Sequence, residues 1–208
     1  PAPDGTLPAA AFDAALSELR ATAQEQQDEI DALIAEAQDA RAANETAAKA
    51  TVARAAVAQI ITALDSGAGF DGALATVAET GLVDVSEDLS AAASGVAPLS
   101  ELQAGIATAA RDALFAARGA ADTGGVGSFF QRQLGARSVT PREGDDPDAV
   151  LSRIEAAVKA GDLSTALTEA EALPPEAQDA MGDWLSQATT RNDAVTAAKA
   201  LADTLAAL

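Results

Sequence analysis

Residues 9–44 read AAAFDAALSELRATAQEQQDEIDALIAEAQDARAAN, and this stretch decides the expected fold. Its apolar and small residues recur at alternating steps of four and three, with charged residues between them. This spacing is typical of a coiled-coil seam. The seam positions are Phe12, Leu16, Leu19, Ala23, Gln26, Ile30, Leu33, Ala37, Ala40 and Asn44. Because neither Gly nor Pro occurs from Ala9 to Ser66, one long helix is expected.

A seam this long and narrow is difficult to bury inside a small domain. We therefore predict that Leu16, Leu19, Ile30 and Leu33 contact other copies of the chain, which makes it a homo-oligomer. The alternative is one long helix that packs within a monomer. A polar seam residue such as Gln26 often determines register and oligomer number, at some cost in stability.

Composition supports an all-α fold for the whole chain of 208 residues. Hydrophobic residues make up 49% but aromatic residues only 3%, because most of the apolar content is alanine. Alanine is the best helix former and buries little area. No alternating, strand-like pattern occurs. We predict a long coiled-coil helix followed by an α-helical bundle with a helical-hairpin C-terminal domain.

Charge and residue types narrow the function. The net charge of −19 disfavours nucleic acid as a partner, because phosphates would be repelled. His and Cys are absent, which removes the commonest bases, nucleophiles and soft metal ligands. We therefore expect no enzymatic activity, no cofactor and no metal.

Turn and cap residues predict shorter helices after residue 66. The expected ranges are 70–80, 86–93, 98–118, 147–160, 163–173 and 176–208. In the third range, Ser100 and Gln103 form a candidate capping box. An apolar stripe there contains Leu102, Ile106, Leu114 and Phe115.

We divide the chain into four regions. Residues 1–46 are a coiled coil, 47–118 a helical region, 119–145 a glycine-rich linker with an amphipathic segment, and 146–208 a C-terminal helical domain. No charge-free run of 18 apolar residues occurs, so no membrane span is expected. The opening residues 1–5 read like a linker inside a longer protein, which is compatible with a targeting or membrane segment upstream.

The segment 129–142, FFQRQLGARSVTPR, differs most from the acidic background because it carries three arginines and no acid. Aromatic and basic residues on a short amphipathic segment suit the headgroup region of an anionic bilayer. The predicted membrane-binding residues are Phe129, Phe130, Arg132, Leu134 and Arg137. The alternative is that the phenylalanines fill a core and the arginines pair with nearby acids.

Two other clusters have ordinary structural explanations. The acidic residues Glu143, Asp145, Asp146 and Asp148 lack the spacing of a calcium loop, and Asp146 before Pro147 is a typical helix cap. The glycines of residues 124–128 follow no strand and precede no Gly-Lys-Ser/Thr, so a linker is favoured over a phosphate-binding loop.

The stretch from Phe129 to the C-terminus resembles the mitofilin family, the core of the mitochondrial contact-site and cristae organising system, and its bacterial relatives. The resemblance rests on segments in order: SVTPR at 138–142, GDDPDAVLSR at 144–153, EAA at 155–157, AGDL at 160–163, AL at 166–167, LPPEA at 173–177 and WL at 184–185.

The resemblance implies a periplasmic body tethered to the inner membrane by an N-terminal anchor that this fragment lacks. It also implies a lipid-binding segment that maps onto 129–142 and a role in shaping membrane invaginations. We expect the C-terminal hairpin and last helix, with Trp184, to form a protein-binding surface or to close a dimer through the C-terminal domain. The rivals are a periplasmic adaptor with a peptide groove at 150–190, and a subunit or degenerate enzyme of membrane-bound tetrapyrrole synthesis.

Overall fold

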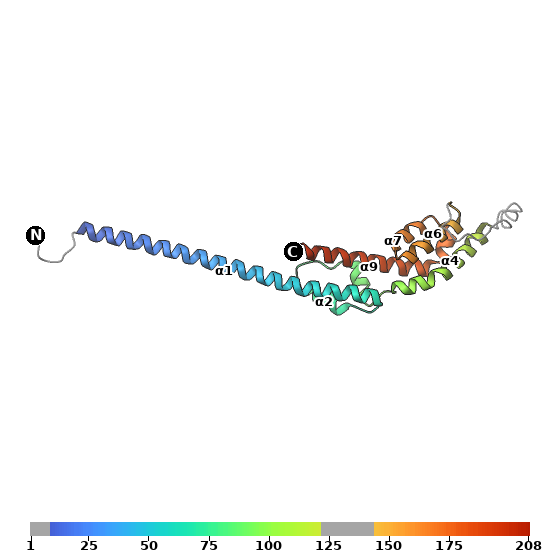
Figure 1. The fold of residues 1–208 in the computed structure, drawn as a ribbon, viewed down its shortest axis with the longest axis horizontal. Helices are drawn as coiled ribbons and strands as arrows, with labels where there is room; N and C mark the ends of the chain where they lie inside the picture. The colour runs from blue at the N-terminus through green and yellow to red at the C-terminus, as the bar shows by residue number, and fades with distance from the viewer. Residues whose placement is uncertain (1–8, 122–143) are drawn as a thin grey trace, which may run out of the picture. The chain divides into compact units, whose positions relative to one another are not determined.

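The computed structural model describes residues 9–121 and 144–208. Over these residues the protein forms eight α-helices and no strand, which confirms the all-α prediction (Figure 1). The helices are α1 (Ala9–Ser66), α2 (Asp71–Thr80), α3 (Glu87–Ala91), α4 (Leu99–Ala121), α6 (Pro147–Ala160), α7 (Leu163–Ala170), α8 (Pro175–Ala180) and α9 (Gly182–Ala206).

Residue contacts divide the chain into two units, 1–49 and 50–208. Helix α1 passes through the division without a break, as the absence of Gly and Pro predicts. In its first part, 11–49, Leu16 is half-buried and every other side chain is exposed. Its second part packs in a core through Ala50, Ala53, Ala56, Val57, Ile60 and Leu64.

Helix α1 ends at Ser66, and the next residue, Gly67, has a φ of +80°, in the left-handed region that favours glycine. A Cβ at this position would lie 3.0 Å from Cδ of Pro98, so a larger residue would also be crowded. The chain can therefore turn sharply here into α2.

The second part of α1, helices α2 and α3, and the C-terminal half of α9 enclose what we call the first core. Its large buried side chains are Val57, Ile60, Leu64, Phe70, Leu74, Val77, Leu89, Val96, Leu201 and Leu205. The backbone N–H of Phe70 donates to Ala93 O at 2.7 Å, which holds the start of α2 against the end of α3. Alanines of α1 and α9 complete this core and allow the helices to approach closely.

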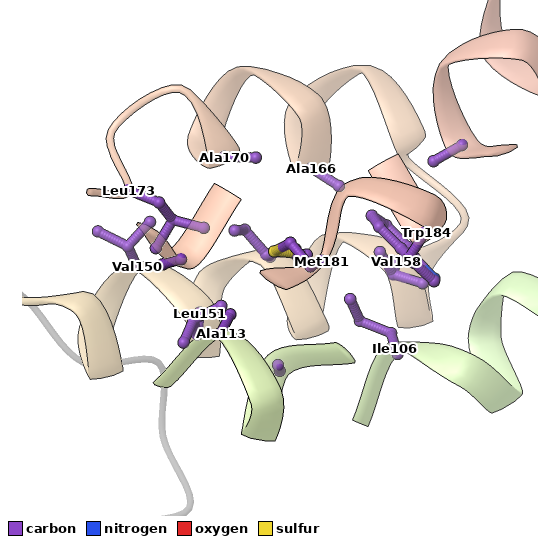
Figure 2. Close-up of a cluster of buried hydrophobic side chains, with 14 of the residues drawn as sticks. Ile106, Ala113, Val150, Leu151, Val158, Ala166, Ala170, Leu173, Met181 and Trp184 are labelled. Atoms are coloured by element: carbon purple, nitrogen blue, oxygen red, sulfur yellow. The ribbon is translucent and has the colours of Figure 1, made fainter. Parts of the chain in front are cut away.

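Helices α4, α6, α7, α8 and the N-terminal part of α9 enclose what we call the second core (Figure 2). Its large buried side chains are Leu102, Ile106, Val150, Leu151, Ile154, Val158, Leu163, Leu173, Met181 and Trp184. Trp184 is only 7% exposed, and its indole Nε1–H donates to Leu102 O at 3.0 Å. The indole ring lies beside Gly105, where an added Cβ would be 3.6 Å from it.

The hairpin of α6 and α7 forms as the local signals predict. The Asp146 side chain accepts hydrogen bonds from Asp148 N and Ala149 N, both at 3.1 Å, and Pro147 occupies the first turn. Gly161 ends α6 in the left-handed conformation. Between the two helices, Arg153 Nε donates to Glu169 at 2.8 Å.

Packing in residues 50–208 crosses the boundaries drawn from the sequence. Helix α4 contacts α6 and α8, and α9 contributes to both cores. Both cores therefore draw on helices from the expected 47–118 and 146–208 regions.

Several details differ from the expectations. Ser100 lies inside α4 rather than before it, and Gln103 Nε2 donates to Val158 O at 3.1 Å, so the predicted capping box is wrong. Helix α7 ends at Ala170, three residues before the expected end. Met181 divides the expected last helix into α8 and α9.

Candidate functional site

The first candidate surface is the seam on the first part of α1. The side chains of Leu19, Ile30 and Leu33 are 66%, 49% and 57% exposed, and Leu16 is half-buried. Phe12, at the start of the seam, is also exposed. Four of the five large seam residues are therefore exposed in the described part of the chain.

Ile34 belongs to the same surface and was missed by the seam analysis. It is 50% exposed and directly follows Leu33. The signal was its spacing of four residues from Ile30, which puts both side chains on neighbouring parts of one helix face. With Ile34 the apolar surface is wider than a strict alternation of four and three residues indicates.

The outer face of this part of α1 carries its own local bonds. Gln24 Nε2 donates to Asp28 Oδ1, and Gln27 Nε2 donates to Asp31 Oδ1, both at 2.9 Å. Such pairs at a spacing of four stabilise an isolated helix by about 0.2–0.5 kcal/mol each. Helix propensity and these bonds support the helix, while its apolar face stays uncovered.

The second candidate surface is the outer face of α4. Phe115 is 81% exposed, the highest value among the exposed large hydrophobic residues of the described chain. It was predicted to lie in the apolar stripe of this helix, and that prediction is wrong. The buried face runs instead through Leu102 and Ile106 and then through alanines at 110, 113 and 117.

Two exposed arginines flank Phe115 on α4. Arg111 lies four residues before it and Arg118 three residues after it, so all three share one helix face. Arg111 Nε donates to Ala107 O, and its Nη2 donates to Thr108 Oγ1, both at 3.0 Å. A small aromatic and basic surface thus lies on an otherwise acidic protein.

The predicted membrane-binding segment lies outside the described residues. This applies to Phe129, Phe130, Arg132, Leu134 and Arg137, to the glycines at 124–128, and to Glu143 of the acidic cluster. These predictions stand on the sequence alone.

The expected role of Trp184 in a protein-binding surface is wrong, because its side chain is buried in the second core. The hydrogen bond to Leu102 O satisfies its only polar group. Trp184 therefore contributes to stability rather than to recognition.

Arg191 is a buried residue that the sequence analysis did not single out. It lies on α9 between the two cores, and its Nη1 donates to Leu64 O, at the end of α1, and to Ala97 O at 3.4 Å. Arg54 makes the converse contact from α1, because its Nε and Nη2 donate to Leu205 O at 3.0 and 2.7 Å. The second part of α1 and α9 are therefore antiparallel, and each supplies a cap for the other.

Several hollows lie on the surface of the described chain. One hollow, ≈ 410 Å³, lies between the α2–α3 loop and α9 and is lined by residues including Leu82, Val83, Leu89 and Leu201. A second hollow, ≈ 320 Å³, lies between α4 and α6. The lining of the first hollow is mainly aliphatic, which suits packing against another apolar group. The second hollow is lined mainly by the polar side chains of Gln103, Glu155 and Lys159.

Among the described titratable groups, one has a clearly shifted pKa. Hydrogen bonds from the backbone and side chain of Thr165 hold the pKa of Asp162 below its ordinary value of 3.8. This carboxylate is the N-cap of α7, so the cause is helix capping. In the residues that the structure describes, no group of three or more acidic side chains gathers to hold a metal ion.

Helix α1 also contains one 18-residue window that is apolar enough to cross a membrane by composition, although it carries charged residues. Buried side chains make up 33% of this window. Since the buried residues of α1 begin at Ala50, the window overlaps the part that packs in the first core. Core helices of soluble proteins meet the same criterion, so the window carries little weight as a membrane span.

Comparisons with known proteins add no relative: no family model, no curated protein and no solved structure matches the chain.

Proposed function

We propose that the protein is a non-enzymatic scaffold of the mitofilin type. It self-associates through the first part of α1 and contacts an anionic bilayer, and in this way organises invaginations of the inner membrane from the periplasmic side. The observation that carries the proposal is the exposed seam. A soluble chain that holds Leu19, Ile30 and Leu33 about half exposed on a single helix gains from covering them.

Burial makes self-association favourable in energy. Full burial of a leucine or isoleucine contributes about 1.5–3 kcal/mol relative to leaving it exposed. Five large seam residues and Ile34 are present in each copy, while alanines and Gln26 occupy the other positions. The expected association is therefore moderate, and it permits assembly and disassembly.

Lipid contact is supported by two sets of residues. One is the segment 129–142, which stands on the sequence, and the other is the described surface of Arg111, Phe115 and Arg118. A chain of net charge −19 is repelled by an anionic bilayer as a whole. Contact must therefore concentrate where arginine and phenylalanine occur together, with each arginine near the surface worth about 1 kcal/mol.

Co-sedimentation with anionic liposomes, at low and at physiological salt, tests the proposal. The unmodified chain is expected to pellet with the lipid, and less so at the higher salt. A Phe130→Ser/Arg132→Asp variant and a Phe115→Ser variant are each expected to pellet less. Val52→Ser is the control, because it removes a 50% exposed apolar side chain of α1 that lies outside both the seam and the two basic sets, and it is expected to leave lipid binding of the chain intact.

A chain that stays in the supernatant at high lipid, with its helicity unchanged, would contradict lipid contact. The adaptor hypothesis would then take its place. It is favoured by the aliphatic hollow of ≈ 410 Å³ beside α9, which could receive an apolar side chain of a partner protein. This hollow lies at residues 82–89 and 197–204, not at the groove of 150–190 that the sequence led us to expect.

A further inference from the structure

The alternating steps of four and three along the seam of α1 define the heptad positions a to g of its residues. Positions a are Leu16, Ala23, Ile30, Ala37 and Asn44, and positions d are Phe12, Leu19, Gln26, Leu33 and Ala40. Residues before a and after d, at positions g and e, flank the seam. Glu36 is at g, while Ile34 and Arg41 are at e.

We propose that the seam is covered by a second copy of the chain, parallel and in register, as a two-stranded coiled coil. This inference rests on the proposed self-association and adds its partner, orientation and strand number. Ile30 at a followed by Leu33 at d is the combination that favours two parallel strands.

Apolar packing alone does not decide the orientation. One antiparallel arrangement also places large residues together. In it the numbers of two facing residues add up to 49, so Leu16 faces Leu33 and Leu19 faces Ile30 of the second copy. The parallel pair places each of these residues against its own counterpart. Polar residues of the seam must therefore distinguish the two arrangements.

The two amides of the seam favour the parallel register. In that register Gln26 faces Gln26 and Asn44 faces Asn44, so each amide can hydrogen-bond to its counterpart. In the antiparallel register Gln26 faces Ala23, so its amide has no amide partner on the second copy. A buried amide without a hydrogen-bond partner opposes association.

Flanking charges favour the same register. In parallel coiled coils, position g of one helix lies next to position e of the following heptad on the other helix. Glu36 then pairs with Arg41 of the second copy, and the two-fold symmetry makes this pair twice. In the antiparallel register positions g face each other, which places Glu36 beside Ala15. Only the parallel pair gains these ion pairs.

A parallel register has a consequence for the proposed function. Residue 50 of both copies lies at the same level, so both copies of 50–208 leave the coiled coil at the same end. Two weak lipid contacts can then act on one bilayer, which raises the overall affinity by effective concentration.

Disulfide trapping tests the register directly, because the chain contains no Cys of its own. An Ala37→Cys variant places one thiol at position a. Parallel, in-register pairing brings the two thiols within disulfide reach, so mild oxidation is expected to convert most of the chain into a covalent dimer. Ala42→Cys, at position f on the outer face, is the control and is expected to cross-link little.

The antiparallel alternative has its own probe. In that register residue 12 faces residue 37, so a mixture of Phe12→Cys and size-tagged Ala37→Cys chains would form a mixed covalent dimer. That product, or a dimer by light scattering in which Ala37→Cys does not cross-link, overturns the inference but leaves self-association intact. A monomer by light scattering overturns both. A parallel dimer that does not co-sediment with liposomes supports the inference and contradicts only the proposed lipid contact.

A charge exchange gives a second readout that does not depend on oxidation. Glu36→Arg alone and Arg41→Glu alone are each expected to weaken the dimer roughly three- to fivefold, because like charges then face each other twice. The double exchange is expected to restore the dissociation constant. If the two single variants and the double exchange all had the same dissociation constant, the parallel register would be contradicted.

Discussion

The two parts of α1 have similar alanine-rich sequences and the same helical backbone, yet their side chains differ in solvent exposure. In 11–49 almost every side chain is exposed, whereas in 50–66 six apolar side chains are buried, five of them in the first core. The difference lies in spacing. The first part has a narrow seam of steps of four and three, and the second has the broader face of Ala53, Ala56, Val57, Ile60 and Leu64.

The comparison shows that the two parts of α1 form a helix whether or not their apolar side chains are buried. Alanine-rich sequence and local bonds maintain the helix in both parts, and among the described residues the second part alone packs in a core. The same substitution should therefore change the stability of 50–208 in one part and the association of copies in the other.

Phenylalanine should show the largest contrast. Phe70 is 4% exposed in the first core, and Phe12 is 55% exposed. Phe70→Ala is expected to reduce the free energy of unfolding by about 3–5 kcal/mol, because it removes a large buried side chain and leaves a cavity. Phe12→Ala is expected to change it by less than about 0.5 kcal/mol.

Urea unfolding below the dimer dissociation constant, followed by far-UV circular dichroism, measures both phenylalanine variants. Equal losses of stability in the two variants would show that the first part of α1 packs within its own chain.

Isoleucine gives the next contrast. Ile60 is fully buried and Ile30 is 49% exposed. Ile60→Ala is expected to cost about 2–5 kcal/mol of unfolding free energy. Ile30→Ala should leave unfolding nearly unchanged and instead raise the dissociation constant of the dimer. Sedimentation equilibrium beside thermal unfolding separates the two effects, and an unchanged dimer in the Ile30 variant would contradict the seam.

Arginine should show a smaller contrast. Arg191→Met removes the donor from Leu64 O and Ala97 O at the junction of the two cores. Leaving a buried carbonyl without its donor costs about 1–3 kcal/mol, which urea unfolding can resolve. Arg20→Met, on the exposed part of α1, is the control with an expected change near zero. Retention of full stability in the Arg191 variant would mean that water replaces the guanidinium.

The smallest effect concerns the cap of α7. Because the folded-state pKa of Asp162 is lowered, its charged form contributes stability above the ordinary value of 3.8, and this contribution is lost as pH falls through the folded-state pKa. Asp162→Asn keeps a capping oxygen without this titration. The stability difference between the two chains is therefore expected to change only in acid, below about pH 4. A constant difference from pH 7 to pH 2 would contradict the capping role.

Local signals predicted most of the helices, because they act through residues close in sequence. Asp146 with Pro147 begins α6, Gly161 ends it, and Ser86 caps α3 by accepting from Leu89 N at 3.3 Å. The seam on α1 was also readable, since spacing along one helix decides which side chains share a face. Spacing does not show what covers the seam or in which direction, so the parallel register is inferred from the polar residues in and beside the seam.

The sequence by itself determined that this chain is helical, where its helices turn, and that an apolar seam lies on its first helix. The tertiary structure decided which faces are buried. It placed Trp184 in the second core, Phe115 in solvent, and Gln103 on the end of α6. It also brought Arg191 to a carbonyl 127 residues away. The physical reason is that alanine can line either a buried or an exposed face, so the pattern of residue types is ambiguous until other helices pack against it.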